Sequence, residues 1–544
     1  MKMKRLFLFL LFFGVSLLST NYLQAQNEEA VDFQFKNSFG TPITGPSPTA
    51  AALGKYGEIP VGYYTGTPNI SVPLYTASGK HFSLPISLSY HASGIKVDEI
   101  ASNVGLGWSL SAGGVITRSV KGLPDEGVNG YFSLPVGDPP SQQDLENAAD
   151  GSLDTEPDIF YFNFAGYSGK FVFDRNQNIV LIPHSDVSIE KFGSLDYWKI
   201  TTPDGLIYTF GQIEQTQSEV GGTTVTPVPM RTSWFLTKIE HPIYDEDPVD
   251  YTEKIELFYN EDYDINYISG FNEAAYVNPG AGSECDVYFA ENMHPTLVPA
   301  FQTTIGKYVS RIETSTQTIE FAYETGREDL PALGNGGTGG KKLKTITVYG
   351  TDGTTRLRYF TFDYDYFTAS GSSIPLLNQV ENYKRLKLLS VSEHSGDDSL
   401  APKVHGFSYK EGNGFDLPPR LSTQQDHWGY ANNNTASTLI PSNNTFYEFS
   451  DGADRSADES RSQANMLTQI SYPTGGHSKF VWEAHRYGNM QNDGPGYACP
   501  DGYVDNDPIA LIGQPFVNDE IQFSIDHDQF PTITTLFYHQ NTGE

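Results

Sequence analysis

Short segments in which polar and apolar residues alternate, joined by turn sequences, recur along most of this chain and constrain its fold more than any other feature. From 81 to 90, apolar residues occupy every second position, and serine, histidine or proline lies between them. Successive side chains of a β-strand point to opposite faces, so this alternation predicts a half-buried strand. The segment 69–75 alternates in the same way, and the turn sequence 77–80 predicts that the two strands form a hairpin. Pro73 and Pro85 lack an N–H donor, which predicts an edge or a bulge at each.

The same plan returns at four further places, where two strand-like segments flank residues such as Asp-Gly or Gly-Gly that favour tight turns. The predicted strand pairs are 170–173 with 179–182, 198–201 with 206–210, 345–349 with 356–362, and 469–472 with 479–482. Single strands are predicted at 160–164, 254–259 and 318–323, and the best helix candidate is 454–467.

These patterns predict an all-β fold in which successive antiparallel hairpins form large twisted sheets, such as β-sandwich-like layers, with very little helix. Aromatic residues make up 13% of the chain and favour strands, so the core is expected to be rich in aromatic rings. We expect Phe82, Leu84, Ile86, Leu88 and Trp108 to be buried. Replacing Trp108 by alanine should then lower the free energy of unfolding by about 3–5 kcal/mol.

The first 25 residues have the pattern of a secretory signal peptide. Three positive charges lie within the first five residues, an apolar run follows at 6–18, and Leu23-Gln24-Ala25 precedes Gln26. We expect cleavage between Ala25 and Gln26. The apolar run is shorter than the roughly 20 residues that a membrane span needs, and no later run reaches that length, so no transmembrane segment is predicted. The expected location is secreted or on the outer cell surface of a Gram-negative-type bacterium.

The charge of the chain argues against nucleic acid as a partner. Removal of residues 1–25, which carry three positive charges and no acid, would take the net charge from −32 to −35. Proteins that bind a phosphate backbone need clustered lysine and arginine. Cys285 and Cys499 are the two cysteines, and the sequence leaves open whether they form a disulfide.

Composition divides the rest of the chain into segments of different character. Residues 26–60 are predicted to be a polar linker, 61–135 an N-terminal β motif, 136–157 an acidic loop rich in proline and glycine, and 158–468 a hairpin-rich region. Residues 469–544 are predicted to be the incomplete start of further β-structure. The segment 534–538 is uncharged and strand-prone, so we expect this edge to pair with a C-terminal continuation or another polypeptide.

Several motifs in a fixed order give the chain a family resemblance. Thr67 to Leu74 is followed by the strand that ends in Ser89-Tyr90 and then by Val104-Gly105-Leu106-Gly107-Trp108-Ser109-Leu110. This order resembles the opening region of the YD-repeat (RHS-type) proteins and of the related toxin-complex shell proteins. Asp426 to Tyr430 and Tyr472 to Gly476 are similar to motifs further along such proteins. The resemblance extends from about residue 61 to 485 and implies an exported protein whose hairpins wind into a shell or a long sheet.

The departures from that family limit what the resemblance implies. Its tandem Arg-Tyr-x-Tyr-Asp units are approached once, at Arg358-Tyr359 with 362–365, and its closing Asp-Pro-x-Gly-Arg signature is absent from the sequence. The resemblance is therefore to the amino-terminal portion only. In many relatives the shell carries or encloses a C-terminal toxin, but encapsulation and toxin delivery do not carry over from this portion. The expected role is a scaffold for a toxin or adhesion module that lies outside this chain.

The sequence offers few residues that point to catalysis or to a cofactor. Asp262, Asp264, Asn266 and Glu273 have the spacing of an EF-hand calcium loop, but Tyr267 stands where the turn needs glycine, so we predict no tight calcium site. His427 is expected to be a packed or hydrogen-bonding residue, and the glycines of 105–114 to serve tight turns or close backbone approach. The acidic pairs Asp98-Glu99 and Asp125-Glu126 could support glycosidase chemistry, although pairs also arise by chance in an acidic chain.

We therefore expect a non-enzymatic structural protein with no catalytic, cofactor-binding or metal site. One alternative is a glycan-binding surface protein, which would show a row of exposed aromatic side chains. The other is a secreted hydrolase, which would show a pocket with two or three converging polar groups.

Overall fold

The computed structural model describes residue 47 and residues 67–133, 141–149, 151–220, 228–241, 253–260, 263–274, 296–332, 338–369, 379–441, 452–484, 487–488 and 503–504. The chain divides into two compact units. One comprises Met1–Thr41 and Pro135–Leu153, and the other comprises Pro42–Leu134 and Asp154–Glu544. All strands described here belong to the second unit.

The structure confirms the all-β class, since strands account for 51% of it and a single α-helix occurs in the described part. The strands are β1 (Ile70–Ser78), β2 (Ser83–Tyr90), β3 (Trp108–Ser111), β4 (Gly114–Ser119), β5 (Ile159–Phe164), β6 (Tyr167–Phe173), β7 (Ile179–Ile182), β8 (Ser188–Phe192), β9 (Tyr197–Thr201), β10 (Ile207–Val220), β11 (Met230–His241), β12 (Glu253–Tyr259), β13 (Tyr263–Ala274), β14 (Thr296–Gly306), β15 (Val309–Glu313), β16 (Thr318–Glu324), β17 (Lys342–Tyr349), β18 (Arg356–Thr368), β19 (Lys384–Ser395), β20 (Lys403–Tyr409), β21 (Leu467–Ser471), β22 (His477–Lys479), β23 (Tyr487–Gly488) and β24 (Tyr503–Val504).

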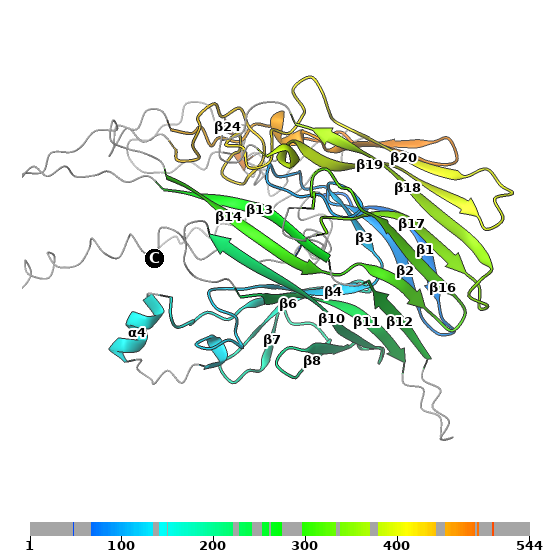
Figure 1. Cartoon of the computed structure of the whole chain (residues 1–544), viewed down its shortest axis with the longest axis horizontal. Helices are drawn as coiled ribbons and strands as arrows, with labels where there is room; N and C mark the ends of the chain where they lie inside the picture. Colours follow the sequence, from blue (N-terminus) through cyan, green and yellow to red (C-terminus); the bar gives the residue numbers. More distant parts are fainter. Residues whose placement is uncertain are drawn as a thin grey trace, which may run out of the picture. The chain divides into compact units, whose positions relative to one another are not determined.

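Antiparallel pairing joins β4 to β22 into one large sheet that branches at β10 and β11 (Figure 1). β11 pairs with β10 along most of its length, with β4 through Ser233–Phe235, and with β12 through Lys238–His241. β10 pairs with β9 near its start and with β14 at its end. A long strand can thus leave one neighbour and join another, which lets the sheet split and curve.

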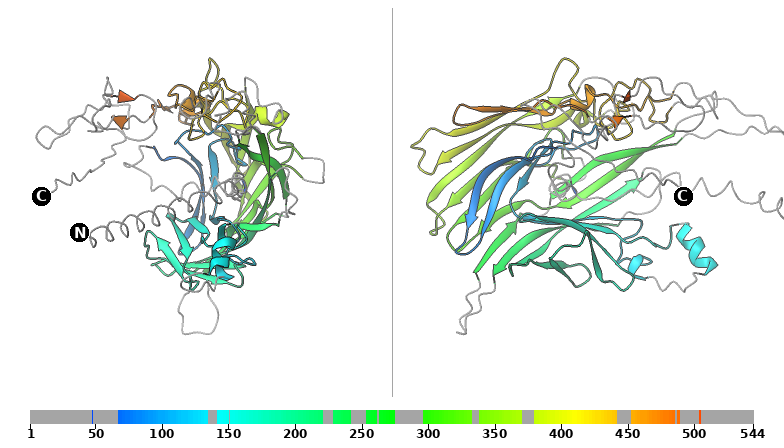
Figure 2. Two further views of the ribbon diagram at one scale, coloured as in Figure 1. Left: turned by 90° about the vertical axis from the view of Figure 1, so that its left-hand side faces the viewer. Right: turned by 180° about the vertical axis from the view of Figure 1, so that it is seen from behind.

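The first three strands form a separate small sheet in the order β1-β2-β3, which lies on the inner side of the curved large sheet (Figure 2). Its apolar side chains and those of the large sheet belong to one hydrophobic core. Pro73 is on the outer strand β1, and the β1–β2 register shifts directly after it, as the sequence predicts. Pro85 is on the central strand and pairs with Thr76 of β1, but β3 pairs with Ser87–Tyr90 only, so Pro85 lies at an open edge on the β3 side.

All five predicted hairpins are paired, as β1–β2, β6–β7, β9–β10, β17–β18 and β21–β22. Gly205, Gly353 and Gly475 in three of the turns have φ of 84°, 65° and 86°, a backbone conformation that favours glycine. The last hairpin differs in register, because its second strand is His477–Lys479 and not 479–482. Trp482 instead packs on the core, and its Nε1 donates to the Leu467 carbonyl at 2.7 Å.

The predicted helix at 454–467 is wrong. Its residues form loops with a short 3-10 turn at Arg461–Gln463, and Leu467 begins β21. The carboxylate of Asp458 accepts the backbone N–H groups of Ser460 and Arg461, at 3.0 Å each. Such local bonds from aspartate compete with the hydrogen bonds of a helix.

The loop predicted at 136–157 instead contains the α-helix α4 (Gln142–Ala149). Ser141 and Asp144 form a reciprocal cap, since the Asp144 N–H donates to Ser141 Oγ at 3.1 Å and the Ser141 N–H donates to Asp144 Oδ2 at 3.0 Å. This Ser-x-x-acid arrangement satisfies two backbone donors at a helix start.

The core contains the side chains that the alternation places inward, with one adjustment. Leu84, Ile86, Leu88 and Trp108 are buried, whereas Phe82 is partly buried at the edge of the core. Residues 1–25, Cys285, Cys499 and the segment 518–544 lie outside the described residues, so the predictions made for them stay predictions. No helix in the described part of the chain is long and apolar enough to cross a membrane.

Candidate functional site

The Gly-Leu-Gly-Trp-Ser-Leu motif leads into β3 of the small sheet and links this sheet to the large one through hydrogen bonds and packing contacts. Gly105 and Gly107 have φ of 110° and 75°, and a Cβ on Gly107 would lie 2.7 Å from the ring of Tyr90. Only glycine allows that approach, as the sequence predicts. The next residue, Trp108, begins β3, and its Nε1 donates to the Tyr409 hydroxyl at 2.9 Å. The motif thus fastens the small sheet to β20, about 300 residues later in the chain.

The Asp426–Tyr430 motif lies against the segment that precedes this link. Asp426 Oδ1 accepts the N–H groups of Trp428 and Tyr430, at 2.9 Å each, which closes a tight turn. The Val97 N–H donates to the Gly429 carbonyl at 2.8 Å, and the Tyr430 hydroxyl donates to the Ser93 carbonyl at 3.0 Å. His427 is predicted to be a packed or hydrogen-bonding residue: its side chain is exposed and touches the Trp428 ring, and its backbone N–H donates to the Arg455 carbonyl at 3.3 Å.

Buried arginines join these segments into what we call the Arg385 junction, which consists of Asp98, Arg327, Asp329, Arg385 and Arg420. Arg327 donates to both carboxylate oxygens of Asp329, at 2.9 and 2.6 Å. It also donates to the backbone carbonyls of Ala101 and Ser102. Arg385 donates to the carbonyls of Val97 and Pro418, at 2.7 and 3.0 Å.

Acceptors from three further segments complete the Arg385 junction. Arg420 donates to Asn382 Oδ1 at 2.8 Å and to the Ile268 carbonyl at 2.5 Å. Asp98, the first residue of a predicted acidic pair, accepts the N–H of Leu421 at 2.8 Å. Burial and the neighbouring Arg420 lower the pKa of Arg385 to about 10. The acids Asp98, Asp329, Glu99 and Glu381 oppose the charges of Arg385 and Arg420, and backbone carbonyls accept the hydrogen bonds of Arg385.

A second cluster, the Arg118 junction, consists of Arg118, Asp125, Glu126, Asp154 and Asp158. Arg118 on β4 is fully buried and donates to Asp158 Oδ2 from Nε at 2.8 Å and from one terminal nitrogen. It also donates to both Glu126 oxygens, at 3.0 and 2.6 Å. Asp125 and Asp158 bind one another's backbone: the Asp158 N–H donates to Asp125 Oδ1 and the Asp125 N–H to Asp158 Oδ2.

Negative charge is in excess at the Arg118 junction. Its four carboxyl groups face one arginine, and Lys191 is the further cation that interacts with Asp125 and Glu126. Burial and the nearby Asp158 carboxylate raise the pKa of Asp125 to about 7. Asp125 Oδ2 is buried and has no hydrogen-bond partner among the described residues. The predicted acidic pair Asp125-Glu126 therefore belongs to a structural ion cluster that holds the loop after β4.

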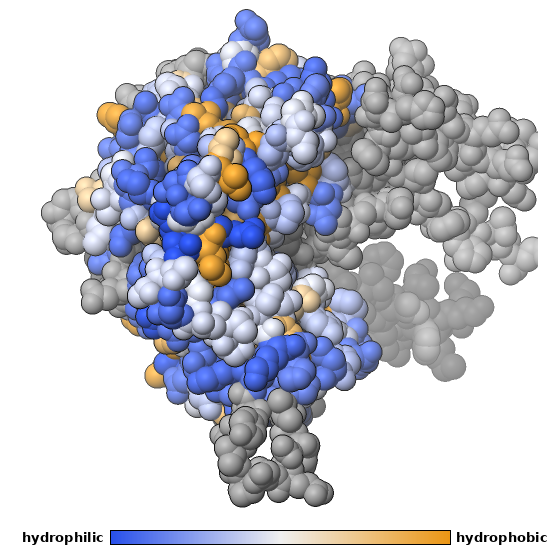
Figure 3. All heavy atoms as spheres, turned by 90° about the vertical axis from the view of Figure 1, so that its right-hand side faces the viewer, coloured by the Kyte–Doolittle hydropathy of each residue, from blue (hydrophilic) through white to orange (hydrophobic). Residues whose placement is uncertain are grey.

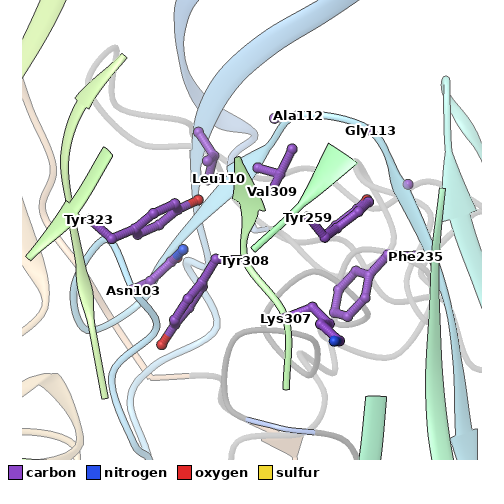
Figure 4. A pocket seen from close by; sticks show the side chains of 11 residues that line it. Asn103, Leu110, Ala112, Gly113, Phe235, Tyr259, Lys307, Tyr308, Val309 and Tyr323 are labelled. Atoms are coloured by element: carbon purple, nitrogen blue, oxygen red, sulfur yellow. The ribbon is translucent and has the colours of Figure 1, made fainter. Parts of the chain in front are cut away.

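A pocket beside the link between the sheets is too small for a substrate (Figure 4). Its volume is about 40 Å³, and Asn103, Phe235, Tyr259, Tyr308 and Tyr323 are among its lining residues. Pockets for small-molecule ligands have volumes of about 300–1,000 Å³. Asn103 Oδ1 and the Tyr323 hydroxyl are buried without a hydrogen-bond partner among the described residues, so the space suits a bridging water molecule.

Three of the four residues that have the spacing of a calcium loop lie on one strand. Asp264, Asn266 and Glu273 are on β13, where Tyr267 pairs with Gln302 of β14, and Asp262 lies outside the described residues. Glu273 accepts the N–H of Leu439 at 2.7 Å. In the described part of the chain, no three His, Cys, Asp or Glu side chains are arranged so that they could hold a metal ion.

Aromatic side chains are mainly internal. Phe160, Phe171, Trp198 and Trp234 form a stacked and edge-to-face cluster between strands of the large sheet. Among the described residues, the large aromatic side chains that are substantially exposed come from four separate segments: Phe258, Phe301, Trp428 and Tyr472. On the face shown in Figure 3, apolar residues lie as small separate patches among polar ones.

The sequence singles out Trp108, Asp98, Asp125 and Asp426, but not their partners. Arg118 and Asp158 are 40 residues apart, and Arg385 and Val97 are 288 apart. No local pattern joins residues so far apart. A scan against protein-family models and a search of curated proteins found no match for this chain.

Proposed function

We propose that this protein is a non-enzymatic, exported structural protein, similar to the amino-terminal part of YD-repeat proteins, that serves as a scaffold for a toxin or adhesion module. The signal-like residues 1–25 and the ordered motifs of 61–485 support the proposal. Its location would be the medium or the outer cell surface, and its partner a C-terminal continuation or another polypeptide.

One observation supports a structural role most directly: the buried charged groups of both junctions bind other parts of the chain, and those of the Arg385 junction bind backbone carbonyls of distant segments. The contacts of Arg385 with Val97 and Pro418 and of Arg327 with Ser102 are of this kind. A catalytic site needs polar groups that face a space where a substrate can bind. Here the same groups hold the chain in a fixed path.

Export is tested by expressing the full chain and a variant without residues 1–25 in a Gram-negative host. The full chain should reach the periplasm, the surface or the medium with Gln26 as its first residue. The truncated variant should stay in the cytoplasm. A mature protein that retains Met1, or equal fractionation of both forms, would contradict export.

The scaffold role is tested against the two alternatives with the purified protein. A panel of chromogenic glycosides and esters should show no turnover above that of the Asp125→Asn variant. A glycan array should show no binding that depends on Trp428 or Tyr472. Turnover lost in Asp125→Asn would favour the hydrolase, and glycan binding lost in Trp428→Ala would favour the glycan-binding protein.

A further inference from the structure

Asparagine is followed by glycine at three places in the chain, and the structure describes two of them. Asn129-Gly130 lies in the loop after β4, and Asn413-Gly414 lies in the loop after β20, while Asn335-Gly336 is outside the described residues. In this dipeptide the main-chain nitrogen of glycine can attack the side-chain amide of asparagine, because glycine has no Cβ that obstructs the approach. The attack requires that the two residues can move toward one another.

The two described asparagines have similar backbone conformation and exposure. Their φ angles are 63° at Asn129 and 50° at Asn413, in the left-handed region that asparagine tolerates better than most residues. Both asparagines are exposed. The two dipeptides therefore differ in the surroundings of the glycine and not in the conformation or exposure of the asparagine.

The fold holds Gly130 in place. Its N–H, the group that would attack, donates to the Gly127 carbonyl at 3.1 Å, and the Asn129 carbonyl accepts the Asp154 N–H at 2.9 Å. Gly130 is buried, and a Cβ at this position would collide with the carbonyl oxygen of Pro124. A rotation that brings the Gly130 nitrogen to the asparagine side chain must break these bonds in a crowded place, which is costly.

The surroundings of Gly414 are much less restrictive. Gly414 is exposed, and no hydrogen-bond partner for its N–H or for the Asn413 side chain occurs among the described residues. The nearest atom to a Cβ at Gly414 would be a terminal nitrogen of Arg461, 4.0 Å away. Arg461 also donates to the Gly414 carbonyl, but its long side chain can follow a movement of the loop. The second dipeptide can thus reach the geometry that the attack needs.

We propose that Asn413 deamidates spontaneously in the folded protein, whereas the fold protects Asn129. The Gly414 nitrogen attacks Cγ of Asn413, so that the N–Cγ bond forms, the Cγ–Nδ2 bond breaks, and the proton of the Gly414 nitrogen leaves with the amide group as ammonia. Water then opens the resulting succinimide ring at one of its two carbonyl carbons. The products are aspartate and isoaspartate, and the sequence of steps needs no oxidant and no reactant other than water.

The loop should accept this modification without unfolding. Isoaspartate adds one carbon atom to the main chain at residue 413, inside the turn that the Phe415 N–H closes on the Gly412 carbonyl at 2.9 Å. Hydrogen bonds on either side do not depend on that turn, since the Asn465 N–H donates to the Lys410 carbonyl at 2.8 Å and Asn465 Oδ1 accepts the Leu417 N–H at 3.0 Å. Deamidation should therefore alter the turn and add a negative charge while the neighbouring core stays intact.

Peptide mapping by mass spectrometry tests the proposal. The purified full chain is incubated at pH 8 and 37 °C in H₂¹⁸O, so that deamidation during the incubation carries the heavy oxygen and deamidation during digestion does not. Position 413 should gain a heavy carboxyl oxygen with first-order kinetics, at least ten times faster than position 129. A smaller ratio of the two rates would overturn the proposal. The Asn413→Gln variant should lose the signal at 413 and keep the wild-type rate at 129.

The same incubation in guanidinium chloride is the control for the fold. Both dipeptides then lie in an unfolded chain, so their rates should converge, chiefly because the rate at Asn129 rises. A ratio that unfolding leaves unchanged would show that the flanking sequence sets the rates, and protection by the fold would be refuted.

Hydrogen exchange of the fresh and the deamidated chain tests whether the loop accepts the change. The Phe415 amide should exchange faster after deamidation, and the Leu417 amide should exchange as before. Loss of protection at Leu417 would show that the modification unfolds this region, contrary to the proposal.

Discussion

The Arg118 junction and the Arg385 junction are both buried and both rich in charge, but burial shifts the pKa of a carboxyl group at the first and of arginines at the second. At the first, Arg118 and Lys191 face four carboxyl groups, and Asp125 keeps a raised pKa. At the second, Arg327, Arg385 and Arg420 face two aspartates, and Arg385 has a lowered pKa. The first joins segments within 40 residues, whereas the second joins segments hundreds of residues apart.

The difference shows two ways of burying charged groups. Excess carboxylate is relieved by a proton, because the pKa of an aspartate can move into the neutral range. An arginine stays charged at ordinary pH, so its charge must be met by carbonyl and carboxylate oxygens fixed in advance. We therefore expect the pKa of Asp125 to make the Arg118 junction respond to pH near neutrality, whereas the arginines of the Arg385 junction keep their charge there.

The largest effect is expected from Arg118→Met, which leaves the fully buried Asp158 without its charged partner. Removal of one member of a buried ion pair costs about 3–5 kcal/mol. Urea unfolding should show a decrease of that size. Lys344→Met, which breaks an exposed pair with Glu324, is the control and should cost about 1 kcal/mol or less. Equal effects of the two substitutions would show that the Arg118 junction adds little to stability.

The pH dependence of stability should differ between the wild type and Asp125→Asn. The pKa of Asp125 is raised to about 7 in the folded protein, above its unfolded value of about 3.9. The folded state therefore holds a proton that the unfolded state releases, and the stabilisation present below pH 4 is lost as the pH rises to 7. The loss attributable to Asp125 should be on the order of a few kcal/mol.

Thermal unfolding from pH 4 to 8 provides the measurement for Asp125. The contribution that falls with pH should disappear in Asp125→Asn, because asparagine cannot titrate. Asp186→Asn, at an exposed position, should keep the wild-type profile. An unchanged profile in Asp125→Asn would mean that another group relieves the charge of this junction.

A smaller effect is expected at the other junction from Arg385→Met. Arg385 donates to the carbonyls of Val97 and Pro418, so its removal leaves neutral acceptors and no carboxylate without a partner. Unpaired buried acceptors cost about 1–3 kcal/mol. Arg385 and Arg420 repel one another, so removal of the Arg385 charge relieves this repulsion and offsets part of the cost. Urea unfolding at pH 8 should show a decrease of this size, and a decrease as large as that of Arg118→Met would contradict the contrast between the junctions.

The sequence was sufficient to predict the five hairpins and the strands β5, β12 and β16, because alternation is a local signal. It did not predict β8, β11, β13, β14, β15, β19 and β20. Leu84, Ile86, Leu88 and Tyr90 are buried at every second position, as their spacing implies. The glycine turns followed from the same local chemistry. The predicted helix at 454–467 failed because its aspartates bind nearby backbone N–H groups, and the helix α4 was missed although Ser141 and Asp144 form a recognisable cap.

The charged junctions could not be predicted in the same way. Asp125-Glu126 is visible as an acidic pair, but its partner Arg118 is one of many charged residues in the sequence. Arg118 and Asp158 lie close together in space because β4 pairs with β5. This pairing places Arg118 opposite Phe160, two residues after Asp158. The Arg385 junction depends on how loops near 97, 327 and 418 meet on β19, and no short-range pattern encodes such a meeting.

The smallest effect is expected from Glu126→Gln. The Glu126 side chain is 19% exposed, whereas that of Asp158 is fully buried, so water can partly replace its bonds to Arg118. Glutamine keeps an oxygen that can accept from Arg118, and its neutrality reduces the excess of carboxylate. These effects partly cancel, and urea unfolding should show a decrease of about 1 kcal/mol or less. Asp158→Asn is the matched comparison and should cost more, because Asp158 also accepts the N–H groups of Lys121 and Asp125. If Glu126→Gln proved as costly as Arg118→Met, Glu126 would be the main partner of the arginine, and relief of excess charge by a proton would no longer describe this junction.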